Sequence, residues 1–138
     1  MHKGLPRRRL GKTDLEISIP ALGAAPIADL YEIIGEKRAL ATLTSAIENG
    51  VNHIDTAPLY GLGLSELRVG AALRRFPDKK IHISSKVGRV TDPFSQTKDR
   101  QVFQGGLNHS ISYDYSYDGV MRSIEQSLLR LGVDQIDL

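Results

Sequence analysis

The sequence predicts an α/β fold in which strands and helices alternate along the chain and the strands form a parallel sheet. Short apolar runs, which are typical of buried strands, alternate with longer segments whose apolar residues recur at helical spacing. The strand-helix repeat has a period of about thirty residues, as right-handed crossovers between parallel strands require. A closed (β/α)₈ barrel takes about 250 residues. With 138 residues, the pattern leaves open either a small open α/β domain or an incomplete barrel.

The first predicted elements are a hairpin and a short strand. Residues 7–18 contain two short alternating segments around a central Gly-Lys-Thr-Asp turn, which is typical of a β-hairpin. Residues 19–23 are predicted to form a short apolar strand, and the small residues Gly23, Ala24 and Ala25 lie at its end. Such small side chains leave room for a ligand near the backbone, and they also suit a tight turn after a strand.

Three helices are predicted from apolar residues spaced three or four positions apart. Ser116 is a suitable N-cap for the third helix. A glycine follows the first and the third helix at the position where helices commonly end. The helices span residues 36–49, 65–75 and 116–131, and their inward-facing sets are Leu40, Leu43 and Ile47; Leu64, Leu67 and Ala71; and Val120, Ile124, Leu128 and Leu131.

Further strands are predicted at residues 51–55, 81–87 and 136–138. Between the second of these and the third helix, residues 89–115 form a long stretch rich in Gly, Ser, Asp and Gln, which predicts a loop. Its aromatic residues either line a substrate pocket over the strand ends or pack at the domain edge, and the pattern leaves both open. They are Phe94, Tyr113, Tyr115 and, at the start of the helix, Tyr117.

Composition argues against several classes of function. The formal net charge of +2 is too small to indicate a nucleic acid as partner. The absence of cysteine removes disulfides and thiolate metal ligands, so we expect no metal site and redox chemistry only through a cofactor. No apolar stretch reaches the roughly 18 to 20 residues that cross a bilayer, and no apolar run follows the basic N-terminus as in a signal peptide. We therefore expect no membrane partner and a cytoplasmic location.

Three ionisable side chains are predicted to meet at the carboxyl edge of the sheet, where ligands of α/β proteins bind. Asp55 and Lys86 each end a predicted strand, and Tyr60 lies in the loop after Asp55. An ammonium beside a phenol lowers the phenol's pKa, and a carboxylate keeps that ammonium charged and oriented. The set predicts proton transfer at a carbonyl or alcohol oxygen while hydride moves at the carbon. Taken singly, each residue also has a structural interpretation, as a turn cap, a packed ring or a solvated lysine.

These residues lie in motifs that resemble the aldo-keto reductase family. The motifs are HIDTAPLYG at residues 53–61, GLSE at 63–66 and ISSK at 83–86, and the resemblance extends from about Arg9 to Leu138. It implies the N-terminal portion of a (β/α)₈ TIM barrel, incomplete in this chain. The hairpin of residues 7–18 would close the barrel bottom, and residues 19–138 would form its first β/α units. Residues 113–123 and 130–137 look most like the branch that contains D-threo-aldose (L-fucose) dehydrogenases and pyridoxal dehydrogenases.

The resemblance implies a role for each matched residue. Tyr60 would give or take the proton, Lys86 would lower its pKa, and Asp55 would hold Lys86 and lie near the nicotinamide ribose. The small residues Gly23, Ala24 and Ala25 would lie near the nicotinamide of NADP or NAD. The family's fourth catalytic residue, a histidine, would follow a few positions after the aspartate matched by Asp137, beyond the end of this chain.

The implied function is that of an NAD(P)-dependent oxidoreductase, which in the intact protein oxidises an aldose at C1 or reduces an aldehyde. Its partner would then be a small carbonyl compound or a sugar. Two alternatives stay open: a non-catalytic cofactor-binding or regulatory protein on the same scaffold, and an inactive truncated fragment. The 138-residue chain by itself is expected to be inactive, because it lacks the closing strands and the histidine.

Overall fold

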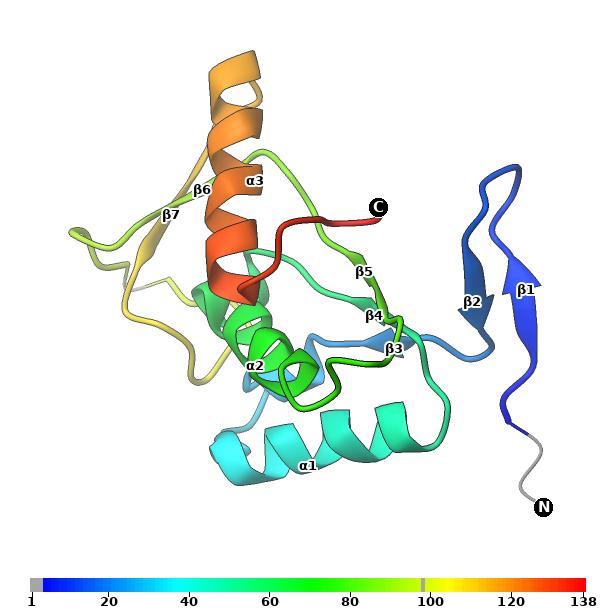
Figure 1. The fold of residues 1–138 in the computed structure, drawn as a ribbon. Helices are drawn as coiled ribbons and strands as arrows, with labels where there is room; N and C mark the ends of the chain where they lie inside the picture. Colours follow the sequence, from blue (N-terminus) through cyan, green and yellow to red (C-terminus); the bar gives the residue numbers. More distant parts are fainter. Residues whose placement is uncertain (1–3, 98) are drawn as a thin grey trace.

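The computed structural model describes residues 4–97 and 99–138. A small antiparallel hairpin, a three-stranded parallel sheet with helices beside it, and a second antiparallel strand pair make up the fold (Figure 1). The α/β order confirms the predicted class. In chain order the elements are β1 (Arg7–Arg9), β2 (Glu16–Ser18), β3 (Leu22–Gly23), η1 (Pro26–Ala28), α1 (Gly35–Glu48), β4 (His53–Asp55), η2 (Tyr60–Gly63), α2 (Leu64–Leu73), β5 (His82–Ser84), β6 (Arg89–Asp92), β7 (Ser110–Tyr113) and α3 (Tyr117–Leu131).

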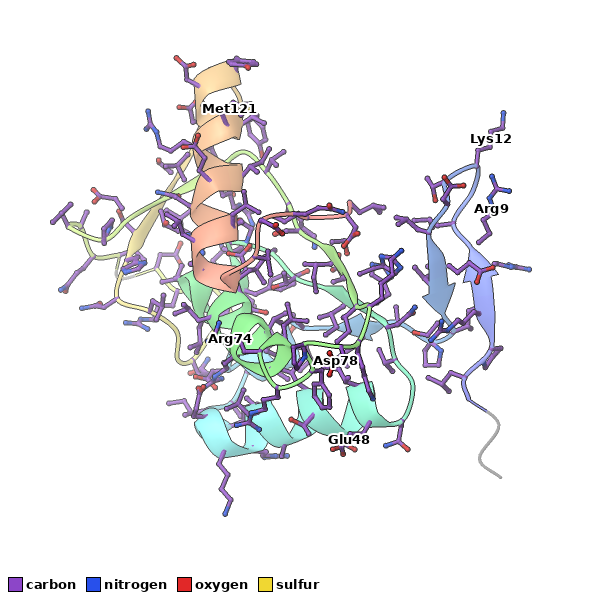
Figure 2. All side chains as sticks on the ribbon, viewed as in Figure 1. Arg9, Lys12, Glu48, Arg74, Asp78 and Met121 are labelled. Carbon is purple, nitrogen blue, oxygen red and sulfur yellow. The ribbon has the colours of Figure 1, made fainter. Side chains whose placement is uncertain are left out.

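The hairpin of β1 and β2 forms where the sequence predicts it and lies beside the amino-terminal end of β4. Asn52, which directly precedes β4, attaches it: the Asn52 side-chain oxygen accepts the Ser18 N–H at 2.6 Å, and its amide donates to the Glu16 carbonyl at 2.9 Å. The exposed Arg9 and Lys12 project from the hairpin (Figure 2). The hairpin therefore leaves the opposite, carboxyl-terminal edge of the parallel sheet uncovered.

Strands β3, β4 and β5 form the parallel sheet, with β4 at its centre. Their register places Gly23, Asp55 and Ser84 in one row at the carboxyl ends of the three strands. Residues 136–138, predicted as a strand, are not a regular strand in the structure, but they do pair with the end of β5. Leu138 donates its N–H to the Ile83 carbonyl at 3.2 Å, and its own carbonyl accepts the Ser85 N–H at 3.1 Å.

The three helices pack in chain order, with α2 between α1 and α3 (Figure 1). Leu43 and Ile47 of α1 are buried, as predicted, and Leu40 packs partly buried against the core. Burial of these apolar side chains supplies the main favourable free energy that joins the helices to the sheet. The core contains Ala39, Leu43, Ile47, Ile54, Val69, Ala72, Ile83 and Leu131.

The inward face predicted for α2 is wrong. Leu67 is 39% exposed, whereas Glu66 and Arg68 are buried. The reason is ion pairing: Arg68 contacts Asp29 at 3.0 Å, and Glu66 accepts from Arg130 at 2.6 Å. Such pairs allow charged side chains to be buried, so the buried face of α2 differs from the one that apolar periodicity predicts.

The buried face of α3 consists mainly of small residues. Ser123 and Ser127 are almost fully buried, while Ile124 and Leu128 of the predicted apolar stripe are only half-buried. Small side chains allow close approach: a Cβ at Gly70 of α2 would collide with the backbone of Leu131. The predicted N-cap is confirmed, because the Ser116 hydroxyl accepts the Gly119 N–H at 3.1 Å.

The loop predicted for residues 89–115 is wrong in part, because it contains β6 and β7. These strands pair antiparallel, with Arg89 opposite Tyr113. Gln126 of α3 accepts the Thr91 N–H at 2.9 Å and donates to the Thr91 carbonyl at 2.8 Å, so α3 holds the edge of β6. Strands this short, with partners about twenty residues away, show little periodicity in the sequence. Within the described residues, no helix is long and apolar enough to span a bilayer.

Candidate active site at the carboxyl edge of the sheet

The row of Gly23, Asp55 and Ser84 forms the base of the candidate site. Asp55 is the last residue of β4, and Ser84 is the last residue of β5. Lys86 follows β5 by two residues, and Tyr60 starts the short helix η2 that follows β4. Parallel pairing therefore brings the three ionisable residues predicted for the site to one edge.

The Lys86 ammonium is the centre of this group. Its Nζ donates to Asp55 Oδ2 at 2.9 Å and to the Thr56 carbonyl at 2.9 Å. The same Nζ lies 4.9 Å from the centroid of the Tyr60 ring. Lys86 thus has a carboxylate on one side and a phenol on the other.

These neighbours raise the pKa of Lys86. Partial burial opposes this by favouring the neutral amine, but the hydrogen bond to Asp55, the negative charge of Asp55 and the neighbouring Tyr60 outweigh it. The Lys86 side chain remains 48% exposed, so solvent weakens the energetic value of the pair. Lys86 is therefore a cation at neutral pH that a ligand can reach.

Ser84 holds the other oxygen of Asp55. Its hydroxyl donates to Asp55 Oδ1 at 2.7 Å, and Nε2 of His53 lies 3.1 Å from the same hydroxyl. Both carboxylate oxygens of Asp55 are consequently engaged, one by Ser84 and one by Lys86. Sequence reasoning missed Ser84, although parallel pairing of the two strand ends would have placed it beside Asp55.

The neighbouring Ser85 is held from the side of the helices. Its hydroxyl donates to Glu66 Oε1 at 2.8 Å, and Glu66 Oε2 accepts from Arg130 at 2.6 Å. Arg130 also donates to the Thr91 hydroxyl at 2.9 Å. This buried group fixes the backbone directly before Lys86 to both α2 and α3.

Tyr60 is positioned by a turn with left-handed backbone. Gly61 and Leu62 have φ values of 62° and 56°. A Cβ at Gly61 would come within 2.9 Å of the Ala28 carbonyl, so glycine is needed there. The Tyr60 ring lies 6.0 Å from that of Phe103, which the stretch between β6 and β7 supplies.

Comparison with known proteins identifies the family of the chain. Residues 21–138 match the model of the Aldo/keto reductase family. The chain belongs to the aldo/keto reductase family. The family resemblance seen in the sequence motifs is thereby confirmed.

Two curated relatives are similar to this chain over part of their length. The chain is 39% identical to pyridoxal 4-dehydrogenase from Microbacterium luteolum, covering 100% of this chain and 43% of the relative. It is 36% identical to D-threo-aldose 1-dehydrogenase from Pseudomonas sp, and the match covers 88% of this chain and 39% of the relative. The chain thus spans about two fifths of the length of these relatives.

Solved aldo/keto reductases show the same partial overlap. Glycerol dehydrogenase from Gluconobacter oxydans superposes with a TM-score of 0.73 at 30% identity, covering 95% of this chain and 37% of that one. An aldo-keto reductase from Klebsiella pneumoniae in complex with NADPH superposes with a TM-score of 0.60 at 25% identity, and the match covers 88% of this chain and 34% of that one. The structure is therefore the N-terminal portion of a (β/α)₈ barrel preceded by a β-hairpin, with the barrel incomplete in this chain.

The three small residues expected near the cofactor differ in their exposure to solvent. Gly23 is exposed, and a Cβ built on it would meet no atom within 4 Å, so the edge beside Asp55 is open there. Ala24 is 0% exposed, donates its N–H to the Asp55 carbonyl at 2.8 Å, and belongs to the core of this aldo/keto reductase. Ala25 is half-buried. Of the three, Gly23 presents the most accessible backbone.

Of the aromatic residues expected at the pocket, Tyr115 lies at a cavity of about 230 Å³ that Lys86 also lines. Phe94 is 99% exposed, and neither it nor Tyr113 or Tyr117 lines that cavity. Tyr115 therefore lines a cavity beside Lys86, whereas the other three are surface aromatics.

Proposed function

We propose that the intact protein containing this chain is an NAD(P)-dependent oxidoreductase that oxidises an aldose at C1 or reduces an aldehyde. The observation that carries the proposal is the Lys86 ammonium between Asp55 and Tyr60, at the sheet edge where ligands bind. The similarity to two curated relatives, an aldose dehydrogenase and a pyridoxal dehydrogenase, supports this substrate class.

In this proposal Tyr60 moves the proton. During oxidation it takes the proton of the C1 hydroxyl as phenolate, and C1 becomes the carbonyl carbon of a lactone. A bound nicotinamide supplies the complementary chemistry, because it accepts hydride from C1. During reduction Tyr60 gives its proton to the carbonyl oxygen instead. The positive charge of Lys86 stabilises the negative charge that develops on the Tyr60 oxygen during the transfer, and Asp55 orients Lys86.

The residues at the sheet edge suit the proposed cofactor, NADP or NAD. Gly23 leaves open space beside Asp55, and the Asp55 side chain is 41% exposed. We propose that the backbone of Gly23, Ala24 and Ala25 lies along the nicotinamide end and that Asp55 contacts the ribose. The solved relative with NADPH supports a dinucleotide in the family. We also propose a cytoplasmic location, as expected from the sequence.

The test is turnover by the intact protein. L-Fucose, D-arabinose and pyridoxal are each offered with NAD⁺ or NADP⁺, and formation of the reduced nicotinamide is followed by absorbance. The proposal expects turnover of at least one ring substrate. The 138-residue chain serves as the control, since we propose that the rest of the barrel is required for cofactor binding. Cofactor binding by the intact protein without any turnover would instead support a regulatory role.

A further inference from the structure

The cavity of about 230 Å³ beside Lys86 has walls of two different kinds. The loop after β4 supplies apolar lining residues. The segments after β5 and before α3 supply the positive charges of Lys86 and Arg89 and the aromatic ring of Tyr115. The lining consists of Ala57, Pro58, Leu59, Lys86, Val87, Arg89 and Tyr115.

The ring of Tyr115 is fixed by its surroundings. It packs on the backbone of Gly88, where a Cβ would collide with the ring, and Gly88 has a φ of +86°. Between the two tyrosines, Asp114 donates its N–H to the Gly88 carbonyl at 3.0 Å. On the other side the ring of Tyr113 stacks on Tyr115, with centroids 6.2 Å apart and planes inclined by 23°.

Arg89 of β6 contacts the outer ring of this aromatic pair. Its guanidinium donates to the Tyr113 hydroxyl at 2.9 Å and lies 5.0 Å from the centroid of the Tyr113 ring. The contact is a cation–π interaction on the outer ring of the pair. Tyr115 nevertheless remains 69% exposed. A ring that is held in place and left open at a cavity beside Lys86 is suited to contact a ligand.

We propose that Tyr115 is the platform on which the ring of the substrate stacks, so that the site prefers six-membered rings bearing hydroxyl groups to acyclic aldehydes. This inference rests on the proposed function. The electron-rich face of a tyrosine attracts the C–H face of a pyranose and stacks with a pyridine ring. The charges of Lys86 and Arg89 at the same wall complement the hydroxyl oxygens of either ring.

The test compares ring and acyclic substrates in the intact protein. Tyr115→Leu keeps an apolar side chain but removes the ring face. It is expected to raise KM for L-fucose and for pyridoxal about two- to tenfold, the range that corresponds to ordinary ring stacking. KM for methylglyoxal, which has no ring, is expected to stay within about twofold. Tyr115→Phe is expected to restore the wild-type KM for both ring substrates.

Tyr117→Leu is the matched control, because Tyr117 is 80% exposed and does not line the cavity. Equal effects of Tyr115→Leu on L-fucose, pyridoxal and methylglyoxal would overturn the proposal, as would an equal effect of Tyr117→Leu. An effect on pyridoxal alone would restrict the platform to flat aromatic rings, and an effect on L-fucose alone would restrict it to sugars.

A binding measurement separates failure of this inference from failure of the proposed function. NMR shifts of the tyrosine rings are recorded while L-fucose, or pyridoxine as a pyridine ring without an aldehyde, is added to the intact protein. The platform predicts that the Tyr115 ring signals move and those of Tyr117 do not, even in a protein without turnover. Unchanged Tyr115 signals at saturating concentrations of both compounds would refute the platform irrespective of catalysis.

Discussion

Ser84 donates its hydroxyl to Asp55 Oδ1 at 2.7 Å, while Asp55 Oδ2 accepts from Lys86 at 2.9 Å. The serine therefore fixes the rotation of the carboxylate that orients Lys86. We expect Ser84→Ala to lower kcat about three- to thirtyfold, because a freely turning Asp55 holds the ammonium less well. Ser84→Thr keeps the hydroxyl and is expected to recover most of kcat. Steady-state kinetics of both variants, with melting temperatures, checks this. A normal kcat in Ser84→Ala would exclude a positioning role.

Replacement of Lys86 tests whether its positive charge supports proton transfer by Tyr60. Lys86→Met removes the ammonium that lies 4.9 Å from the centroid of the Tyr60 ring, so we expect kcat for oxidation to fall by at least about a hundredfold. The check is steady-state kcat, with Lys86→Arg as the variant that keeps the charge and is expected to retain more activity than Lys86→Met. A kcat of Lys86→Met equal to that of the wild type would contradict the role given to Lys86.

The buried ion pair between Glu66 and Arg130 is predicted to stabilise the folded protein. Glu66 is 0% exposed and accepts from Arg130 and from Ser85, so Glu66→Ala leaves a buried cation without its partner. We expect a loss of about 3 to 5 kcal/mol in the free energy of unfolding. Arg38→Ala is the control, because its 3.8 Å contact with Glu32 is exposed and is worth at most about 1 kcal/mol. Urea unfolding measures both, and equal losses would contradict this explanation.

The sequence predicted the hairpin, the parallel sheet and the meeting of Asp55, Tyr60 and Lys86, because each depends on local pattern and on the end of a strand. It did not predict the buried face of α2, since Glu66 and Arg68 are accommodated only by partners far along the chain. Strands β6 and β7 were missed because each is short and pairs with a strand about twenty residues away. In general, features that depend on a partner far along the chain leave little periodic signal in a single sequence.

Asp137 is predicted to make the free energy of unfolding depend on pH in the acid range. Partial burial opposes ionisation, but the Ile83 N–H at 2.9 Å and His82 at 3.2 Å outweigh it, and the pKa of Asp137 is lowered below 3.8. A lowered folded-state pKa means that the contribution is complete above the unfolded pKa near 4 and is lost as pH falls through the lower, folded value. We expect Asp137→Asn to flatten the stability curve below about pH 4. Unfolding measured from pH 2 to pH 7 tests this, and an unchanged acid slope would contradict it.

The most direct test of the account is Tyr60→Phe in the intact protein. The ring still packs near Phe103, and only the exchangeable proton is lost. We predict that kcat for L-fucose or pyridoxal falls at least about a thousandfold at every pH, while nicotinamide affinity, measured by fluorescence titration, stays within about twofold. Near-normal kcat in Tyr60→Phe would contradict the assignment of proton transfer to Tyr60, and a large loss of cofactor affinity would make Tyr60 a structural residue instead.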